Sequence, residues 1–230
     1  MERVQKPFKK IIVTIDGPAG AGKTTISKLL ADKLGYRYLD TGALYRAVAV
    51  AATDRGIAVD DDLALESLCR DMVIDLRSSA DGLRVLVNQD DVTGRLRTPQ
   101  ISMMASAVSA RSVVRRFLLT VQRQLGEQKG VVAEGRDMGT VVFPQAEAKF
   151  FLDADPHIRA RRRHEELIVQ KGERPSLESV EKQMLQRDHN DSTRSLAPLQ
   201  PAEDAVRIDS THLTLDQVIH QMLDYIEQIQ

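Results

Sequence analysis

Short apolar runs alternate with longer amphipathic stretches along most of the chain. Residues 9–17 (KKIIVTIDG) form a β-branched run that ends at Asp16 and Gly17, which is typical of a buried strand. In the following stretch, apolar residues recur at helical spacing as far as Gly35, which predicts a helix that ends there. Because such alternation requires a sheet between layers of helices, the pattern predicts an α/β fold with a parallel sheet covered on both faces.

The same criteria predict the remaining elements. Further strands of the sheet, which would have five in all, are expected at 36–40, 131–134, 148–153 and 204–211. Helices are expected at 41–56, at 61–70, within 99–129, from Pro156 onward, at 176–194 and at 211–230. The apolar face of the closing helix is expected to consist of Leu215, Val218, Ile219, Met222 and Ile226.

The pattern changes between about residues 72 and 97. The runs MVIDLRS (72–78), GLRVLVN (82–88) and DVTGRLRT (91–98) read as short strands that are separated by turn residues and by no helix. They predict three antiparallel strands that interrupt an otherwise alternating chain. We therefore expect a single domain over residues 1–230, with a small antiparallel β subdomain inserted at 60–100.

Composition excludes several kinds of partner. The chain has 32 Lys and Arg against 33 Asp and Glu, so a general nucleic-acid or membrane surface is not expected. Aromatic residues make up 4% and Trp is absent, which disfavours a base-stacking platform. One cysteine permits no internal disulfide. The start, MERVQKPFKK, precedes only a short apolar run, so we expect no secretory signal, a cytoplasmic location and, because no long apolar seam is left over, a monomer.

Residues 17–24 match the phosphate-loop pattern G-x-x-x-x-G-K-[ST], between a predicted strand and a predicted helix. Small residues let backbone N–H groups converge on phosphate oxygens, and the following helix turns its positive end toward the anion. Lys23 would add a charge between the β- and γ-phosphates, and Thr24 would supply a hydroxyl for Mg²⁺. The loop predicts nucleotide binding without deciding between a motor, a switch and a kinase. The residues expected to bind ATP here are Gly17, Pro18, Ala19, Gly20, Ala21, Gly22, Lys23, Thr24 and Thr25.

Arginines follow the predicted strand ends. They are Arg46 after the second strand, Arg136 beside Asp137 after the third, and Arg159, Arg161, Arg162 and Arg163 after the fourth. Arg187, Asp191 and Arg194 are spaced so that a continuous helix would place them on one face. Each group also has a simpler interpretation, as an exposed ion pair, a turn or a solvated face. Together they suggest two phosphate-bearing substrates and phosphoryl transfer, in which cations stabilise the charge on the transferred group.

Six segments then occur in a fixed order: GPAGAGKTT, YLDTGALYR, EGRDMGTVVFP, FLDAD with the arginine-rich stretch, RD…D…R…APL and DST. This succession resembles the bacterial cytidylate kinase family over nearly the whole chain, from Ile11 to about Ile226. The resemblance implies a P-loop kinase core with five parallel strands and a mobile helical lid at 156–175. It also implies transfer of the γ-phosphoryl group of Mg²⁺-bound ATP to CMP or dCMP.

The resemblance also implies which residues form the site. Those acting on the transferred group would be Lys23, Arg136, Arg162 and Arg194, with Arg159 and Arg163 as further candidates for the ATP phosphates. The acceptor would be bound by Thr41, Tyr45, Arg46, Ser106, Arg115, Arg136, Asp137, Arg187, Asp191 and Arg194. Asp137 can accept a hydrogen bond from the cytosine N4 amino group, where uracil has an acceptor instead. Two alternatives remain: a kinase of the same architecture for shikimate, a coenzyme A precursor or another monophosphate, and a non-catalytic nucleotide-binding regulator or nucleic-acid partner.

Overall fold

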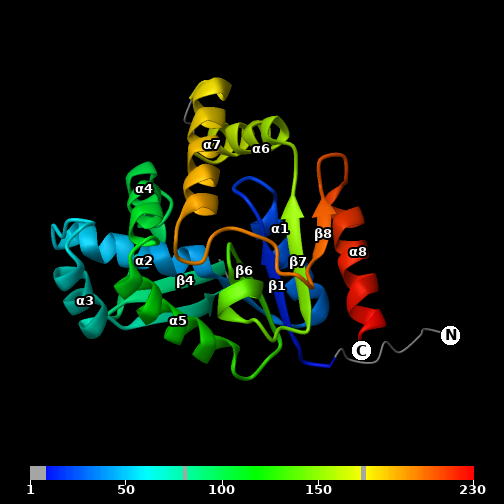
Figure 1. Cartoon of the computed structure of the whole chain (residues 1–230), viewed down its shortest axis with the longest axis horizontal. Coiled ribbons are helices and arrows are strands. Elements are labelled where there is room, and N and C mark those ends of the chain that lie inside the picture. Colours follow the sequence, from blue (N-terminus) through cyan, green and yellow to red (C-terminus); the bar gives the residue numbers. More distant parts are fainter. Residues whose placement is uncertain (1–8, 80–81, 172–174) are drawn as a thin grey trace. The chain divides into compact units, whose positions relative to one another are not determined.

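Strand β1 (Ile12–Asp16) lies at the centre of a five-stranded parallel sheet in the computed structural model, which describes residues 9–79, 82–171 and 175–230. The strand order is β2-β6-β1-β7-β8, and β1 pairs in parallel with both β6 and β7 (Figure 1). The α/β fold class predicted from the alternating pattern is confirmed. In the register, Asp16 at the end of β1 lies opposite Gly135 at the end of β6, so the segments that follow these two strands start side by side.

The elements have the following bounds. The other strands of the parallel sheet are β2 (Arg37–Asp40), β6 (Val131–Gly135), β7 (Ala148–Asp153) and β8 (Val206–Asp209). The α-helices are α1 (Lys23–Leu34), α2 (Thr41–Asp54), α3 (Asp62–Asp71), α4 (Pro99–Val108), α5 (Ser112–Gly126), α6 (Pro156–Lys171), α7 (Leu177–Thr193) and α8 (Leu215–Gln228). Within the described ranges, every helix falls short of the length and apolar character needed to cross a bilayer.

The chain divides into two compact units, one made of residues 1–39 and 126–230 and the other of residues 40–125. The first unit holds the parallel sheet. The second holds α2, α3, α4, most of α5 and an antiparallel sheet of the strands β3 (Ile74–Ser79), β4 (Gly82–Val87) and β5 (Asp90–Asp91). The antiparallel strands expected in this region are therefore present, and the bounds 60–100 for an inserted subdomain stay a prediction. Of the predicted lid at 156–175, residues 172–174 lie outside the described residues.

The third antiparallel strand is present, but its predicted bounds, residues 91–98, are wrong. Strand β5 ends at Asp91, and Thr93–Arg95 form η1, a short 3₁₀ turn. The cause is local. The Asp91 carboxylate accepts from the Thr93 backbone N–H at 2.9 Å, and the Thr93 hydroxyl accepts from Val85 N–H at 2.9 Å. Side chains thus take backbone groups that a longer strand would have paired, which is how Asp and Thr compete with a sheet ladder.

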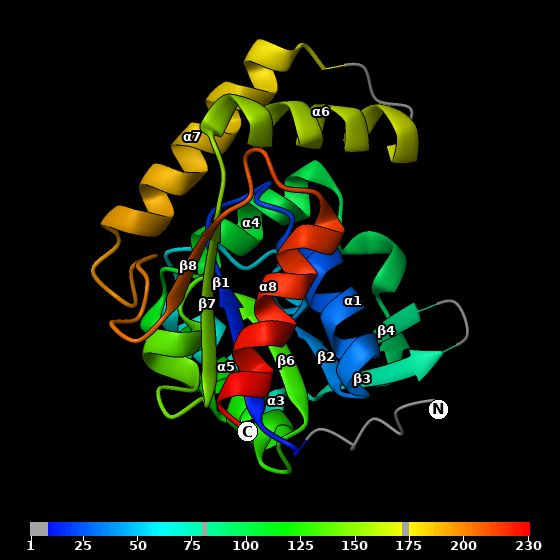
Figure 2. The same cartoon turned by 90° about the vertical axis from the view of Figure 1, so that its right-hand side faces the viewer.

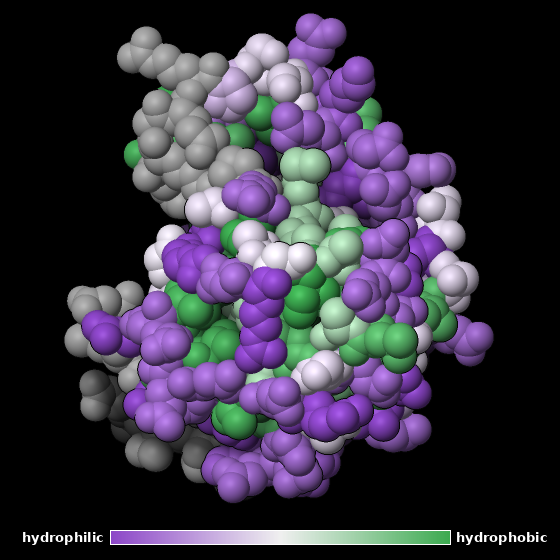
Figure 3. Space-filling view, turned by 90° about the vertical axis from the view of Figure 1, so that its left-hand side faces the viewer, coloured by the Kyte–Doolittle hydropathy of each residue, from purple (hydrophilic) through white to green (hydrophobic). Residues whose placement is uncertain are grey.

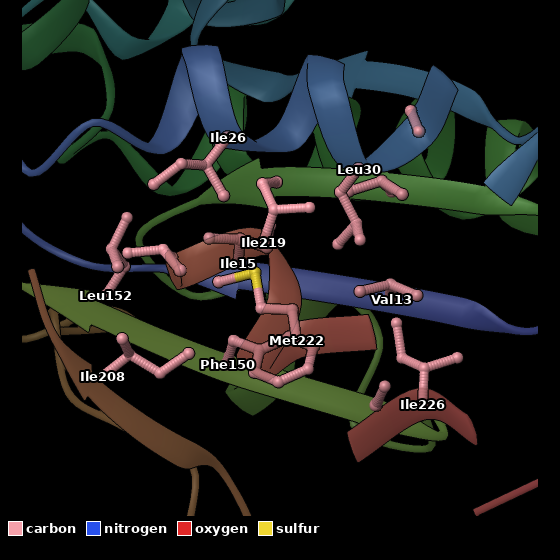
Figure 4. Close-up of a cluster of buried hydrophobic side chains, with 14 of the residues drawn as sticks. Val13, Ile15, Ile26, Leu30, Phe150, Leu152, Ile208, Ile219, Met222 and Ile226 are labelled. Atoms are coloured by element: carbon pink, nitrogen blue, oxygen red, sulfur yellow. The ribbon is translucent and has the colours of Figure 1, made fainter. Parts of the chain in front are cut away.

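One face of the parallel sheet is covered by α1 and α8, which Figure 2 shows in front of the strands. Figure 4 shows the buried side chains that join these layers, including Ile15 of β1, Leu30 of α1, Phe150 of β7 and Met222 of α8. The Phe150 ring also meets the Tyr225 ring edge-on, with centroids 5.6 Å apart. Burying this apolar surface stabilises the sheet whose strand ends carry the polar residues described below.

The predicted apolar face of α8 needs one correction. Val218, Ile219, Met222 and Ile226 are buried, but Leu215 is 46% exposed. Leu215 is the first residue of α8, directly after the Thr214 cap, which bonds with Gln217 in a capping box. At that position the helix has only begun, so helical spacing alone does not tell whether the first apolar residue reaches the sheet.

The different burial of Met222 and Leu215 on α8 predicts different effects on stability. Met222→Ala should lower the free energy of unfolding by about 2–5 kcal/mol, because it leaves a cavity among α1, α8 and the sheet. Leu215→Ala on the same helix should change it by no more than about 0.5 kcal/mol. Urea denaturation of both variants measures this, and equal losses would contradict the packing described.

Candidate active site

The phosphate loop, residues 17–22, connects β1 to α1 and needs glycine for two close approaches. Gly17 has φ +148°, and a Cβ there would lie 1.9 Å from the Leu152 carbonyl oxygen of β7. Gly20 has φ +74°, and a Cβ there would meet Met184 Cε of α7 at 2.6 Å and the Arg159 carbonyl oxygen of α6 at 2.9 Å. The loop therefore lies against β7, α6 and α7 with no room for side chains at these positions.

Helix α1 begins directly after this loop and differs from its neighbours at its N-terminus. In α2 and α3 the side chains of Asp40 and Asp61 cap the first turn, whereas within the described residues no side chain caps α1. The first turn of α1 instead contains Lys23, Thr24 and Thr25. Uncapped amides at the positive end of a helix, next to a glycine-rich loop, are suited to bind phosphate oxygens.

Lys23 is buried and folded back onto the loop, where its Nζ donates to the Pro18 carbonyl at 2.6 Å. Burial lowers the pKa of Lys23 to about 7, and the charges of Arg136 and Arg187 act in the same direction, against Glu134. A buried ammonium among other cations is unfavourable until an anion joins them. The arrangement thus favours a phosphate group at this end of the loop.

Glu134, at the end of β6, receives hydrogen bonds from two directions. Thr24 Oγ1 donates to Glu134 Oε2 at 3.1 Å, and the Tyr38 hydroxyl of β2 donates to Glu134 Oε1. Glu134 is 5% exposed. Glu134 therefore holds the Thr24 hydroxyl at the start of α1. Its own carboxylate places a second oxygen donor, of the kind that binds Mg²⁺, next to that hydroxyl.

Asp16 links the end of β1 to the segment after β6. Its two carboxylate oxygens accept from the backbone N–H groups of Met138 at 2.9 Å and Gly139 at 2.8 Å. These residues begin η2 (Met138–Val142), a π-helical turn of a kind often found at functional sites. Burial raises the pKa of Asp16 to about 6, despite the two backbone hydrogen bonds. Asp16 therefore fixes the backbone that follows Arg136 and Asp137.

Arg136 and Asp137 meet residues from the end of α7. Arg136 Nε donates to Asp191 Oδ2 at 2.8 Å. Arg194 lies between two carboxylates, with Nη2 3.7 Å from Asp137 Oδ1 and Nη1 3.9 Å from Asp191 Oδ1. Burial alone would raise the pKa of Asp191, but the charges of Arg136, Arg187 and Arg194 hold it below its ordinary value. The predicted acceptor residues of the first unit thus form one cluster, which we call the arginine–aspartate cluster: Arg136, Asp137, Arg187, Asp191 and Arg194.

The prediction that Arg187, Asp191 and Arg194 lie on one face of a continuous helix is wrong in part. Helix α7 ends at Thr193, and Arg194 has the extended dihedrals φ −63° and ψ 142°. Its Nε donates to the Ala197 carbonyl at 2.8 Å, so the turn after the helix orients the guanidinium. Arg187 and Asp191 share a helix, whereas Arg194 reaches the cluster from outside it.

The arginines of α6 have separate surroundings. Arg159 is 5% exposed, and its guanidinium donates to the carbonyls of Ala154 and Ala19 and to Asp188. Arg162 donates to the hydroxyl and carbonyl of Ser210, in the DST segment after β8. Arg163 forms an ion pair with Glu166, one turn further along α6. Of the three, only Arg159 bonds directly to the phosphate loop in the described part of the chain.

The remaining predicted residues lie in the second unit, residues 40–125. Thr41 is the buried first residue of α2, and Arg46 Nη2 forms an ion pair with Asp40 at 3.1 Å. The Arg115 guanidinium lies 5.8 Å from the centroid of the Tyr45 ring. The structure thus brings Tyr45 and Arg115 together, and it places Ser106 in α4, where its carbonyl accepts from the Ser109 hydroxyl at 2.7 Å.

The family model for cytidylate kinase matches residues 13–228. This chain belongs to the cytidylate kinase family. It is 51% identical to the cytidylate kinase of Geobacter sp. (strain M21) over 212 residues, which cover 92% of this chain and 91% of that protein. It is 50% identical to the cytidylate kinase of Geobacter sulfurreducens over 218 residues, covering 95% and 93%.

Among solved structures, shikimate kinase from Bacteroides thetaiotaomicron has a similar fold. It aligns with a TM-score of 0.50 at 12% identity, and the alignment covers 95% of this chain and 99% of that one. This likeness concerns the fold alone. As a member of the cytidylate kinase family, the chain is a nucleoside monophosphate kinase that uses ATP.

Three acidic residues that bond to the candidate site received no role from the sequence, although Glu134 and Asp188 lie inside the segments EGRDMGTVVFP and RD…D…R…APL. Asp16, Glu134 and Asp188 each bond to a predicted site segment that is far away along the chain, so no local spacing reveals them. Asp16 and Glu134 do stand at the ends of predicted strands. In an α/β sheet that position is where ligands bind, so it is the signal that could have marked them.

The burial of Lys23 predicts how stability depends on pH. In the unfolded chain Lys23 keeps its proton up to about pH 10.5, whereas the folded, nucleotide-free protein releases it above about pH 7. The unfolded state then binds more protons, so stability rises with pH between these values. Urea unfolding of wild type and Lys23→Met at pH 7, 8 and 9 should show wild type gaining stability relative to the variant. A constant difference would contradict the depressed pKa.

Proposed function

We propose that this kinase transfers the γ-phosphoryl group of Mg²⁺-bound ATP to CMP or dCMP, giving ADP and CDP or dCDP. Family membership supports the reaction, and one structural observation carries its assignment to these residues. The end of β1 lies opposite the end of β6, so the phosphate loop and the arginine–aspartate cluster are anchored at neighbouring strand ends. The phosphate loop can hold the phosphates of ATP, and the arginine–aspartate cluster can hold the phosphate of the acceptor.

In this proposal the chain mainly orients the substrates and stabilises charge. An oxygen of the CMP phosphate forms a bond to the γ-phosphorus, while the bond from that phosphorus to the β–γ bridging oxygen breaks and ADP leaves. The attacking oxygen is already anionic, so no protein base is needed. Lys23 and the loop amides hold the ATP phosphates, and Arg136 and Arg194 match the acceptor phosphate, since a guanidinium can bond to two of its oxygens.

The oxygen groups beside Lys23 fit a magnesium ion carried by the nucleotide. Mg²⁺ prefers oxygen ligands and commonly takes one or two from the protein and the rest from phosphates and water. The Thr24 hydroxyl and the Glu134 carboxylate, 3.1 Å apart, offer such ligands at the start of α1. We assign Thr24 as the ligand and Glu134 as the group that orients it. The bound ion would neutralise charge that develops on the phosphates.

Recognition of the base is assigned to Asp137. A carboxylate accepts from the cytosine N4 amino group and repels the uracil O4 acceptor. Asp137 is 2% exposed, and its backbone carbonyl accepts the N–H groups of Val141 and Val142 in η2. The carboxylate is therefore presented from a fixed turn. Arg187 and Asp191 are proposed to hold the ribose.

The other predicted contacts remain part of the proposal. Thr41, Tyr45, Arg46, Ser106 and Arg115 are proposed to bind the acceptor, and Arg162 and Arg163 the ATP phosphates. We also propose a monomer in the cytoplasm that binds neither nucleic acid nor membranes. On the face of the chain drawn in Figure 3, hydrophilic side chains surround apolar ones that gather near its middle.

The proposal is tested by an acceptor screen with ATP, in which ADP release is coupled to a reporter. We expect turnover with CMP and dCMP, and little with shikimate, AMP or GMP. Lys23→Met should reduce kcat for CMP by about 10²-fold or more, because it removes a cation from the transferred group. Lys33→Met, at an exposed position of the same helix, is the matched control and should retain wild-type activity.

Two outcomes of the screen would decide against the proposal. A wild-type protein that bound ATP but released no ADP with any small acceptor would favour the non-catalytic regulator. Preferred turnover of another acceptor would favour a different kinase of the same architecture.

The role of Asp137 predicts a change in specificity. Asp137→Asn should lower the ratio of kcat/KM for CMP over UMP by about tenfold or more, because an amide can donate to uracil O4 as well as accept from cytosine N4. The KM for ATP serves as the internal control and should change little. An unchanged preference for CMP over UMP would exclude Asp137 as the residue that reads the base.

A further inference from the structure

In the phosphate loop, the backbone N–H and the backbone carbonyl of Ala19 both form hydrogen bonds with side chains from outside the loop. Its N–H donates to Asp188 Oδ1 of α7 at 3.1 Å, and its carbonyl accepts from Arg159 Nη1 of α6 at 2.9 Å. The same Arg159 nitrogen also donates to the other oxygen of Asp188. Ala19, Arg159 and Asp188 therefore form a closed set of three contacts.

The two side chains are themselves fixed. Arg159 Nε donates to the Ala154 carbonyl at 2.9 Å, just after the end of β7, and the side chain of Arg159 is 6% exposed. Met184 of α7 and the backbone of α6 at Arg159 leave no space for a Cβ at Gly20, the residue after Ala19. The first turn of α6 and the middle of α7 thus contact the loop at adjacent residues.

The charges of the pair make this arrangement compatible with an anionic ligand. A lone carboxylate next to a phosphate-binding loop would repel the phosphates. Asp188 is neutralised by Arg159, so it can orient the Ala19 peptide without that penalty. The Nε and Nη1 atoms of Arg159 donate to the protein itself. The pair of Arg159 and Asp188 can therefore affect how ATP binds without either side chain touching ATP.

The geometry points to Arg159 and Asp188 as positioning residues for ATP: together they hold the phosphate loop, through Ala19, in the conformation that binds the nucleotide. This inference deepens the proposed function and rests on it for the identity of the nucleotide. It gives Arg159 an indirect role, through the loop backbone. Convergent loop amides bind phosphate well only when the loop does not have to be ordered on binding.

The test compares Asp188→Ala with Asp188→Asn, which have the same charge. Only asparagine keeps an oxygen that can accept from Ala19 N–H. The control is Glu181→Ala, because Glu181 pairs with His157 at 3.5 Å and so joins the same two helices without contacting the loop. Calorimetry with a non-hydrolysable ATP analogue and, separately, with CMP measures both affinities, and thermal unfolding measures stability.

We expect Asp188→Ala to raise the Kd for the ATP analogue about tenfold or more, since a lost hydrogen bond to a charged group has an effect of this order. Its Kd for CMP should stay within about threefold of wild type, a margin of less than 1 kcal/mol by the same conversion. Asp188→Asn should restore most of the ATP affinity, and Glu181→Ala should leave it unchanged.

The inference is overturned if Asp188→Ala binds the ATP analogue as wild type does, or if both nucleotides lose affinity in parallel with thermal stability. If Asp188→Ala does not fold, Arg159→Lys replaces it, because an ammonium keeps the charge but cannot reach Ala154, Ala19 and Asp188 together. Wild-type ATP affinity in that variant would equally overturn the inference. The proposed function fails separately, if wild type phosphorylates no CMP while these ATP affinities behave as expected.

Discussion

Carboxylates at the end of β6 and on α7 hold the cations of this candidate site in place, and the rest of the site depends on that pairing. Asp191 orients Arg136, Asp188 neutralises Arg159, and Glu134 lies next to the buried Lys23. Removing such charges from water is costly, and buried pairs often add little to stability. What these pairs provide is a fixed position for each cation. Arg136 and Asp191 are 55 residues apart along the chain, and Arg159 and Asp188 are 29 residues apart.

The sheet supplies the frame for these pairs. The β1–β6 register sets Asp16 beside Gly135, and Asp16 then binds the first two amides of η2. The loop after β1 and the turn after β6 are thus tied to each other as well as to the sheet. The core between α1, α8 and the strands is apolar and closely packed, so it holds the strand ends rigidly while the polar groups at those ends remain available for ligands.

Local patterns in the sequence predicted the elements, and long-range contacts determined what they do. The phosphate loop and the five strands follow from spacing within windows of about ten to twenty residues. The bond between Asp188 and Ala19 spans 169 residues, and the bond between Thr24 and Glu134 spans 110, so neither leaves a local pattern. The errors have a similar origin. Thr93 ended a predicted strand through its own side chain, and Arg194 lies beyond the end of the helix on which its spacing had placed it.

The central claim is that one chain binds two anionic nucleotides at once, and calorimetry tests it most directly. A non-hydrolysable ATP analogue and CMP would be titrated separately, and CMP would also be titrated into protein saturated with the analogue. The account predicts one site for each nucleotide and binding of CMP to the analogue-loaded protein. Binding of the analogue alone, with no heat from CMP under either condition, would contradict it.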